Sequence, residues 1–190
     1  MRVIAGTYRS RPLITPPGTA TRPTSDRLRE TLFNVLAARV EGSHFADLYA
    51  GCGAVGIEAL SRGAEHVFFS ESNTRAATAI RANLRSLEIK SGYTVETSTA
   101  TLMKRLVRQN AVLDLVFLDP PYEAADEYTR TLTALGSDAL TGTLAEDAVV
   151  IAEHTRKHAL LDRYGRLGRT RTLLQGDAAL SFYSLSFRME

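Results

Sequence analysis

Apolar residues along the chain form two alternating kinds of segment. Continuous apolar runs predict strands at 45–50, 66–71, 93–98, 113–118 and 147–153. Between and before them, apolar residues at helical spacing predict helices, among them 54–63 and 73–88 and one that carries Leu28 to Leu36. Strands that are apolar throughout and alternate with helices predict an α/β fold, a doubly wound parallel sheet covered on both faces.

The two ends of the chain depart from this alternation. Residues 169–175 and 179–187 read as two strands joined by a tight turn, which predicts an antiparallel hairpin and makes the sheet seven-stranded and mixed. Residues 1–20 predict a small β-hairpin that carries Arg9 and Arg11 outward. So short a segment must lean on the main domain, 21–190, or on a partner.

Composition and charge narrow the function classes. The 190 residues suit one globular domain, no apolar run is long enough to span a membrane, and no signal-peptide core follows Met1, so a cytoplasmic location is expected. Cys52 and the four histidines show no metal-ligand spacing, so no metal is expected. Residues 1–40 hold seven Arg and two acids, a net +5, and the remainder carries −3. This asymmetry favours a polyanionic partner, with a solvated Arg-rich surface as the alternative.

A glycine-rich turn follows the first predicted strand. Gly51, Gly53 and Gly56 give G-x-G-x-x-G, a pattern that lets a ligand approach the backbone closely and that serves both dinucleotides and S-adenosylmethionine. Asp47 lies four residues before Gly51, where it would repel a pyrophosphate and attract an ammonium group, so the pattern favours S-adenosylmethionine. Glu71 ends the second strand, where an acid accepts hydrogen bonds from ribose hydroxyls; a helix cap is its alternative role.

The most specific motif is Asp119-Pro120-Pro121-Tyr122, directly after the fourth strand. An exocyclic amine of a base is a poor nucleophile, and it improves when acceptors hold its N–H bonds and turn it toward a methyl donor. Asp119 and the Pro120 carbonyl supply such acceptors, and Tyr122 offers a ring on which a flipped base can stack. Guanine presents adjacent N1–H and N2–H₂ donors that suit a carboxylate, whereas adenine presents an acceptor beside its amine. This favours guanine without excluding adenine.

Segments 2–6, 22–34, 47–64 and 119–122 together resemble the RsmD family of small-subunit rRNA guanine-N2 methyltransferases. The resemblance implies a Rossmann-like class I methyltransferase domain, S-adenosylmethionine as donor, and one guanine of 16S rRNA as acceptor, within the 30S subunit or a late precursor. Two departures from the family pattern are Cys52 in place of Ser and Thr99 in place of an acid that meets the cofactor adenine.

Three groups of candidate residues follow. The candidate catalytic residues are Asp119, Pro120, Pro121 and Tyr122; the candidate cofactor-binding residues are Thr24, Asp47, Tyr49, Gly51, Gly53, Glu71, Ser72, Thr99 and Ala100; the candidate RNA-binding residues are Arg9, Arg11 and Arg22. A monomer is expected, because no exposed apolar stripe is left over. The alternatives are a DNA adenine-N6 methyltransferase, a non-catalytic RNA-binding assembly factor and a nicotinamide-dependent oxidoreductase, of which Asp47 disfavours the last.

Overall fold

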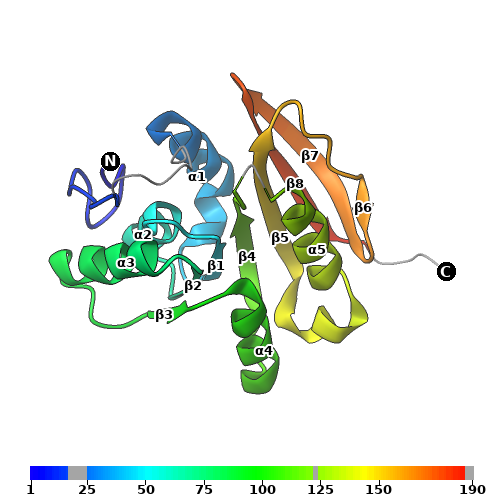
Figure 1. Ribbon diagram of the computed structural model, residues 1–190, viewed down its shortest axis with the longest axis horizontal. Helices are drawn as coiled ribbons and strands as arrows, with labels where there is room; N and C mark the ends of the chain where they lie inside the picture. Colours follow the sequence, from blue (N-terminus) through cyan, green and yellow to red (C-terminus); the bar gives the residue numbers. More distant parts are fainter. Residues whose placement is uncertain (17–24, 122–123, 187–190) are drawn as a thin grey trace.

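The computed structural model describes residues 1–16, 25–121 and 124–186, and its helices and strands alternate along the chain (Figure 1). The elements are α1 (Asp26–Val40), β1 (His44–Leu48), α2 (Ala54–Ser61), β2 (His66–Ser70), α3 (Thr74–Ser86), β3 (Tyr93–Glu96), α4 (Thr99–Gln109), β4 (Leu113–Leu118), α5 (Ala125–Leu135), the 3₁₀ helix η1 (Asp138–Thr143), β5 (Leu144–Thr155), β6 (Arg163–Tyr164), β7 (Leu167–Gln175) and β8 (Ala178–Leu185). Among the described residues, no helix combines the length and apolarity needed to cross a membrane.

One sheet runs through the molecule in the order β3-β2-β1-β4-β5-β8-β7-β6. The first five of these strands are parallel, and β8, β7 and β6 pair antiparallel. The predicted mixed sheet is therefore confirmed, with eight strands rather than seven, because the two residues of β6 are too few to show a periodic pattern. The strand order reverses between β1 and β4, and the carboxyl ends of parallel strands at such a point border the usual ligand crevice.

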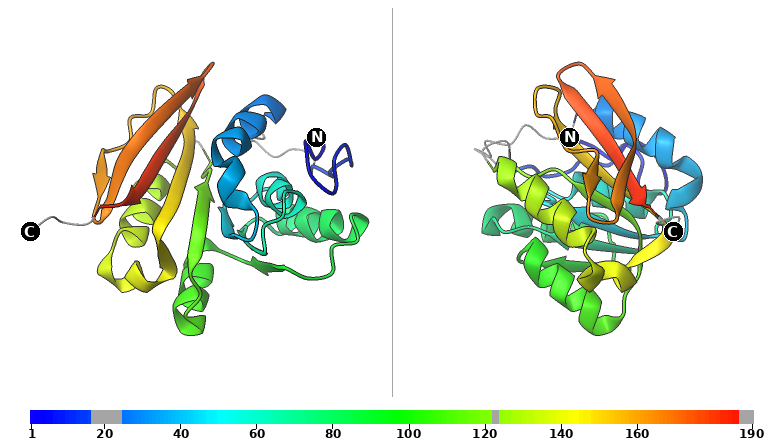
Figure 2. Two further views of the ribbon diagram at one scale, coloured as in Figure 1. Left: turned by 180° about the vertical axis from the view of Figure 1, so that it is seen from behind. Right: turned by 90° about the vertical axis from the view of Figure 1, so that its right-hand side faces the viewer.

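Helices cover both faces of the parallel part of the sheet (Figures 1 and 2). The core on one face combines apolar residues of α1, α2 and α3 with Leu115 and Phe117 of β4. The core on the other face combines those of α4 and α5 with Val116 and Leu118. Successive side chains of a strand point to opposite faces, so a strand that is covered on both sides is mainly apolar, as the sequence predicted; Asp47 of β1 and Asp114 of β4 are exceptions.

Residues 1–16 form a short, irregular hairpin that packs against α2 and α3. An antiparallel bridge pairs Arg2 with Pro12, and backbone hydrogen bonds of 3.0 Å join Val3 to Arg11 and Leu13 to Met1, although neither arm is long enough to count as a strand. The backbone turns sharply at Gly6, where φ is +81° and an added Cβ would lie 1.8 Å from the Ser61 carbonyl oxygen. Val3 and Leu13 are buried in the α1–α3 core. The prediction that this segment leans on the main domain is therefore correct.

A buried carboxylate anchors the N-terminal segment to α2. Glu58 accepts hydrogen bonds from the backbone N–H groups of Ile4, at 2.7 Å, and Ala5, at 3.0 Å, and from Arg62 Nε at 2.8 Å. Its side chain is fully buried. These charge-assisted bonds satisfy backbone groups that the irregular loop leaves outside any ladder.

Candidate active site

The glycine loop connects β1 to α2 at the carboxyl edge of the sheet. Gly51 has φ +56° and Gly53 has φ +82°, a left-handed backbone that glycine adopts without strain. An added Cβ at Gly51 would meet none of the described residues within 4 Å, whereas one at Gly53 would lie 3.2 Å from Ile80. Gly51 therefore faces open space where a ligand can approach the backbone, and Gly53 packs against α3.

Asp47 lies in β1, just before this loop in the chain, and is almost fully buried. Its Oδ2 accepts a 2.8 Å hydrogen bond from the Gly56 N–H, which ties the start of α2 to the strand. Burial raises the pKa of Asp47 to about 7; the bond from Gly56 acts against that rise, and the charge of Glu71 adds to it. A cation bound next to Asp47 would favour its ionised form.

Glu71 follows β2 and holds the outer end of the glycine loop. One carboxylate oxygen accepts from the Gly51 N–H at 2.7 Å and the other from the Asn73 N–H at 2.7 Å. Asn73, not Glu71, caps α3 through its side chain. Glu71 is thus fixed beside the loop, and each of its oxygens keeps a second lone pair with which to accept a ribose hydroxyl.

Asp119 stands directly after β4. Leu118 pairs with Leu48 of β1 and with Ala152 of β5, so Asp119 is the next residue along, between the ends of these two strands. Burial raises the pKa of Asp119 well above its ordinary value, and the charges of Glu153 and Asp47 add to the rise. Pro120 is buried beside it, which holds this turn in place.

Glu153 is a site residue that the sequence analysis missed. It lies in β5, 4% exposed, one step beyond the Ala152 that pairs with Leu118. The signal that could have found it is the one that selected Glu71 and Asp119, an acid at the end of an apolar run. The sequence offers no second signal for Glu153, because no glycine loop or proline motif lies close to it in the chain.

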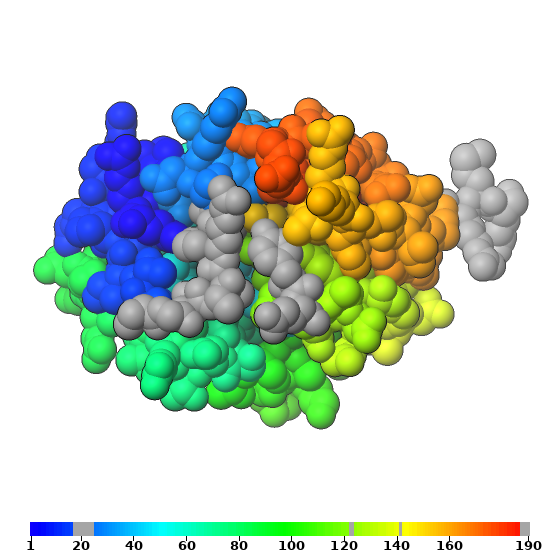
Figure 3. Space-filling model, turned by 45° about the horizontal axis from the view of Figure 1, so that its top comes forward, coloured from blue at the N-terminus to red at the C-terminus, as the bar shows by residue number. Residues whose placement is uncertain are grey.

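Four carboxylates therefore converge on one face of the sheet edge. Asp47, Asp119 and Glu153 each lie two residues after a side chain of the α1–α3 core, namely Phe45, Phe117 and Ile151. Side chains two apart in a strand share a face. Glu71 follows Phe69 by the same spacing. In Figure 3 this edge of the molecule comes forward, with the N-terminal residues and α1 in blue on one side and β5 to β8 in yellow to red on the other.

Other predicted cofactor residues lie around this edge with different roles. The Tyr49 backbone belongs to the loop, with φ +63°, but its hydroxyl donates to Glu127 of α5 at 2.8 Å, on the opposite face. Thr99 Oγ1 lies 3.0 Å from Ser70 Oγ, next to the end of β2. Ser72 and Ala100 are exposed beside these elements. Thr24, Arg22 and Tyr122 lie outside the described residues.

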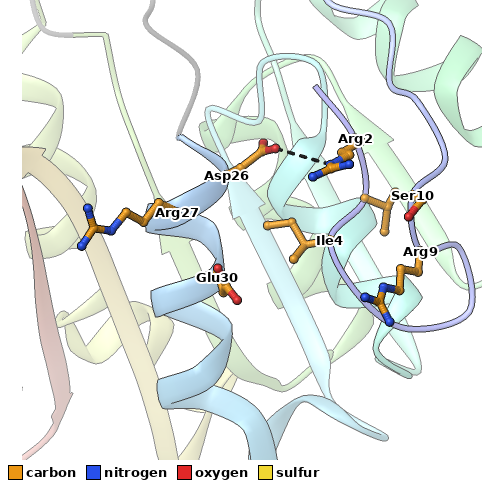
Figure 4. Close-up of a pocket in the computed structure, with 8 residues that line it drawn as sticks. Arg2, Ile4, Arg9, Ser10, Asp26, Arg27 and Glu30 are labelled. Carbon is orange, nitrogen blue, oxygen red and sulfur yellow. Dashed lines mark ion pairs between the residues drawn. The ribbon is translucent and has the colours of Figure 1, made fainter.

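A groove lies between the N-terminal segment and α1 (Figure 4). Its volume is about 320 Å³, and it is lined by the basic side chains of Arg2, Arg9 and Arg27 together with Asp26 and Glu30. Arg11 lies apart from it, with Nη2 donating to the Ser86 carbonyl at 2.8 Å. Arg9 and Arg11, both predicted from the sequence to bind RNA, therefore lie in different places in the structure.

Known proteins resemble this chain over its whole length. The family described as Conserved hypothetical protein 95 matches residues 1–184. A Bacillus subtilis protein, YlbH, provisionally named an rRNA methyltransferase, is 34% identical over 96% of this chain and 98% of its own. Ribosomal RNA small subunit methyltransferase D of Escherichia coli K12 is 32% identical over 84% of this chain and 77% of its own.

A solved structure agrees with these relatives. An Escherichia coli protein, provisionally named methyltransferase yhhF, superimposes with a TM-score of 0.82 at 30% identity, covering 98% of each chain. The predicted class of fold and the predicted family are confirmed. The predicted cofactor, S-adenosylmethionine, is confirmed with them, since these relatives carry methyltransferase names.

Proposed function

Because the chain belongs to the Conserved hypothetical protein 95 family, which is the RsmD family, we propose that it methylates N2 of one guanine in 16S rRNA of the small ribosomal subunit. The names of relatives from Escherichia coli and Haemophilus influenzae, ribosomal RNA small subunit methyltransferase D, support the class of substrate. The observation that carries the choice of reaction is Asp119, placed next to Asp47 and the glycine loop at the reversal of strand order.

The residues at the carboxyl edge suit S-adenosylmethionine. Gly51 leaves open space over the loop, Glu71 offers acceptors for ribose hydroxyls, and Asp47 offers a negative charge for an ammonium group. A pyrophosphate would need basic side chains close to these acids. Among the described residues, the hydrogen bonds to Asp47 and Glu71 come from backbone N–H groups and not from a basic side chain. When bound, the cofactor supplies an electrophilic methyl group on a sulfonium.

Asp119 holds the acceptor base. Its carboxylate accepts the N1–H and one N2–H of guanine, which are adjacent donors, and the Pro120 carbonyl accepts the other N2–H. Held in this way, N2 would present its lone pair to the sulfonium methyl group that bound S-adenosylmethionine would supply. Transfer would release S-adenosylhomocysteine, and N2 would lose one proton to solvent. Positioning of this kind contributes up to roughly 7–11 kcal/mol in well-oriented systems.

The raised pKa of Asp119 has a consequence for binding. Desolvation and the neighbouring acids favour its protonated form in the free protein. A base edge that presents only donors favours the ionised form, so binding of guanine releases that proton. Asp119 is therefore ionised when the N–H groups of a bound guanine donate hydrogen bonds to its carboxylate.

Methyl transfer from labelled S-adenosylmethionine tests the proposal. The substrates are unmodified 30S subunits, naked 16S rRNA and unmethylated duplex DNA, with the product nucleoside identified by mass. We expect N2-methylguanosine from one of the RNA substrates. N6-methyladenine from DNA would refute the proposal in favour of a DNA methyltransferase, and no transfer to any substrate would leave a binding protein.

Two variants connect the reaction to the site. Asp119→Asn keeps the shape but introduces an NH₂ group, and we expect turnover to fall roughly 10²–10³-fold. Cofactor affinity should change little, because Asp119 faces the base. The matched control is Asp126→Asn on α5, an exposed acid outside the site, which should keep wild-type turnover. Equal turnover of the two variants would remove Asp119 from the mechanism.

A further inference from the structure

A fully buried arginine has no role in the site described so far. Arg29 lies in the first turn of α1 and is 0% exposed. Its Nη2 donates to the Arg2 carbonyl at 2.6 Å and to Asp26 Oδ1 at 3.0 Å. Its Nε and Nη1 are buried without a hydrogen-bond partner among the described residues. Part of the guanidinium fork is therefore left unused.

Such an arrangement is costly unless something else completes it. A guanidinium is always charged and carries five N–H donors in a planar fork. Its carboxylate neighbour Asp26 is half exposed and contacts only one of the three nitrogens. Unpartnered donors of a buried charged group cost more than those of a neutral one. An anion that accepts hydrogen bonds from the free Nη1 would remove part of this cost.

Arg29 lies close to the glycine loop. It donates to the carbonyl of Arg2, and the preceding residue, Met1, contacts Cys52 of the loop with an Sδ–Sγ distance of 3.8 Å. Cys52, the residue between Gly51 and Gly53, has its thiol pKa raised mainly by burial; the charge of Asp47 acts in the same direction and the charge of Arg29 acts against it. The loop therefore lies within electrostatic reach of one buried anion and one buried cation. An α-amino acid group carries an ammonium and a carboxylate on one carbon atom, which is the complementary arrangement.

We propose that Arg29 binds the carboxylate of the methionyl part of the cofactor, through its free Nη1, while Asp47 attracts the ammonium group. Arginine is suited to this task because it is always charged and its hydrogen bonds to a carboxylate are charge-assisted. Arg29 also contacts Arg2 through the backbone, so a bound carboxylate links α1, the N-terminal segment and the glycine loop.

A phosphate of RNA is a poor candidate for the same nitrogens. Arg29 is fully buried, whereas a polymer phosphate needs an open approach, and the exposed Arg9 and Arg27 in the groove between the N-terminal segment and α1 provide one. The proposal rests on cofactor binding and not on the identity of the methylated base. It therefore stands or fails independently of guanine N2 methylation.

Calorimetric titration without RNA tests the proposal. The two probes are S-adenosylhomocysteine and its methyl ester, in which the carboxylate is replaced by a neutral ester that is larger by one methyl group; the Arg29 variants below separate the effect of charge from that of size. For the wild type we expect the free acid to bind about tenfold to hundredfold more tightly than the ester, as for loss of a hydrogen-bonded charged group. A wild type that binds both equally would overturn the proposal.

Variants assign that preference to Arg29. Arg29→Met removes the charge and should bind both probes equally; Arg29→Lys keeps the charge without the fork and should show a reduced preference. The ratio is measured within one protein, so a smaller folded fraction does not affect it, and Arg29→Lys serves if Arg29→Met does not fold. The control, Arg85→Met, changes an exposed arginine of α3 that belongs to neither site and should keep the wild-type ratio. Wild-type ratios in the Arg29 variants would overturn the proposal.

Discussion

Replacing Asp47 by Asn should make the protein more stable at neutral and alkaline pH while weakening cofactor binding. Asp47 is 2% exposed, and its one described hydrogen bond comes from the Gly56 N–H. An Asn side chain keeps an oxygen that can accept this bond and removes the buried charge. The acid is therefore retained at the expense of stability, as is common for residues that serve binding.

The size and sign of the effect follow from the pKa of Asp47. The pKa rises from 3.8 in the unfolded chain to about 7 in the folded protein, about 3 units, and each unit corresponds to about 1.36 kcal/mol. Between these two values the folded state binds more protons than the unfolded state, so the free energy of unfolding falls as pH rises. Above pH 7 the loss reaches about 4 kcal/mol, which Asp47→Asn avoids.

Urea unfolding followed by far-ultraviolet circular dichroism measures the effect, since the chain has no Trp. We expect the free energy of unfolding of Asp47→Asn to rise relative to wild type by up to about 4 kcal/mol between pH 4 and pH 8. The new buried NH₂ group lowers the stability of the variant by about 1–3 kcal/mol at every pH, so it changes the offset and not this rise. The exposed control Asp126→Asn should stay within about 0.5 kcal/mol of wild type. A difference for Asp47→Asn that does not change with pH would refute the argument.

Three further predictions concern the loop, the anchor and the groove. Gly56→Ala places a Cβ 2.3 Å from Phe69 Cε1, so we expect a loss of about 1–3 kcal/mol in urea unfolding and weaker binding of S-adenosylhomocysteine; unchanged values would show that α2 can shift freely. Glu58→Gln leaves part of the N-terminal anchor unpaired and should cost about 3–5 kcal/mol; amide hydrogen exchange should accelerate in residues 1–16 first, and uniform acceleration would contradict this. Arg9→Ala should lower RNA affinity and reduce the salt slope by about 1, measured by filter binding over a salt series, and an unaltered slope would count against the groove as an RNA contact.

Local patterns were enough to predict most of the architecture. The run 113–118 was predicted with the bounds that β4 has, because all of its residues except Asp114, near the start, are apolar. The ends of β1, β2 and β3 lie one or two residues earlier than predicted, since residues 49–50, 71 and 97–98 leave the ladder to form the edge where the candidate site lies. The predicted N-terminal hairpin is present only as one bridge with a few cross-strand hydrogen bonds, because Ile4, Ala5 and Tyr8 donate to side chains of α2 instead of extending the pairing.

The candidate site was predictable only where its residues adjoin a strong local signal. Asp47 and Asp119 could be selected because each adjoins a glycine or proline motif, and Glu71 because it ends the strand that follows the glycine loop. Glu153 and Arg29 carry no such signal. From the sequence alone, Glu153 is one more acid at the end of a strand, and Arg29 resembles a solvated arginine of an amphipathic helix. Their burial and their neighbours depend on which strands and helices pack together.

The sequence by itself determined which segments are strands and helices, that the sheet is parallel and buried, and which turns carry chemistry, because these depend on periodicity and on residues close together in the chain. Only the tertiary structure decided that Asp119 stands between β1 and β5, that Glu153 raises its pKa, and that a buried Arg29 lies within electrostatic reach of Cys52 in the glycine loop. The physical reason is that desolvation and charge interactions act through space, and the distances that set them follow from strand order and helix packing.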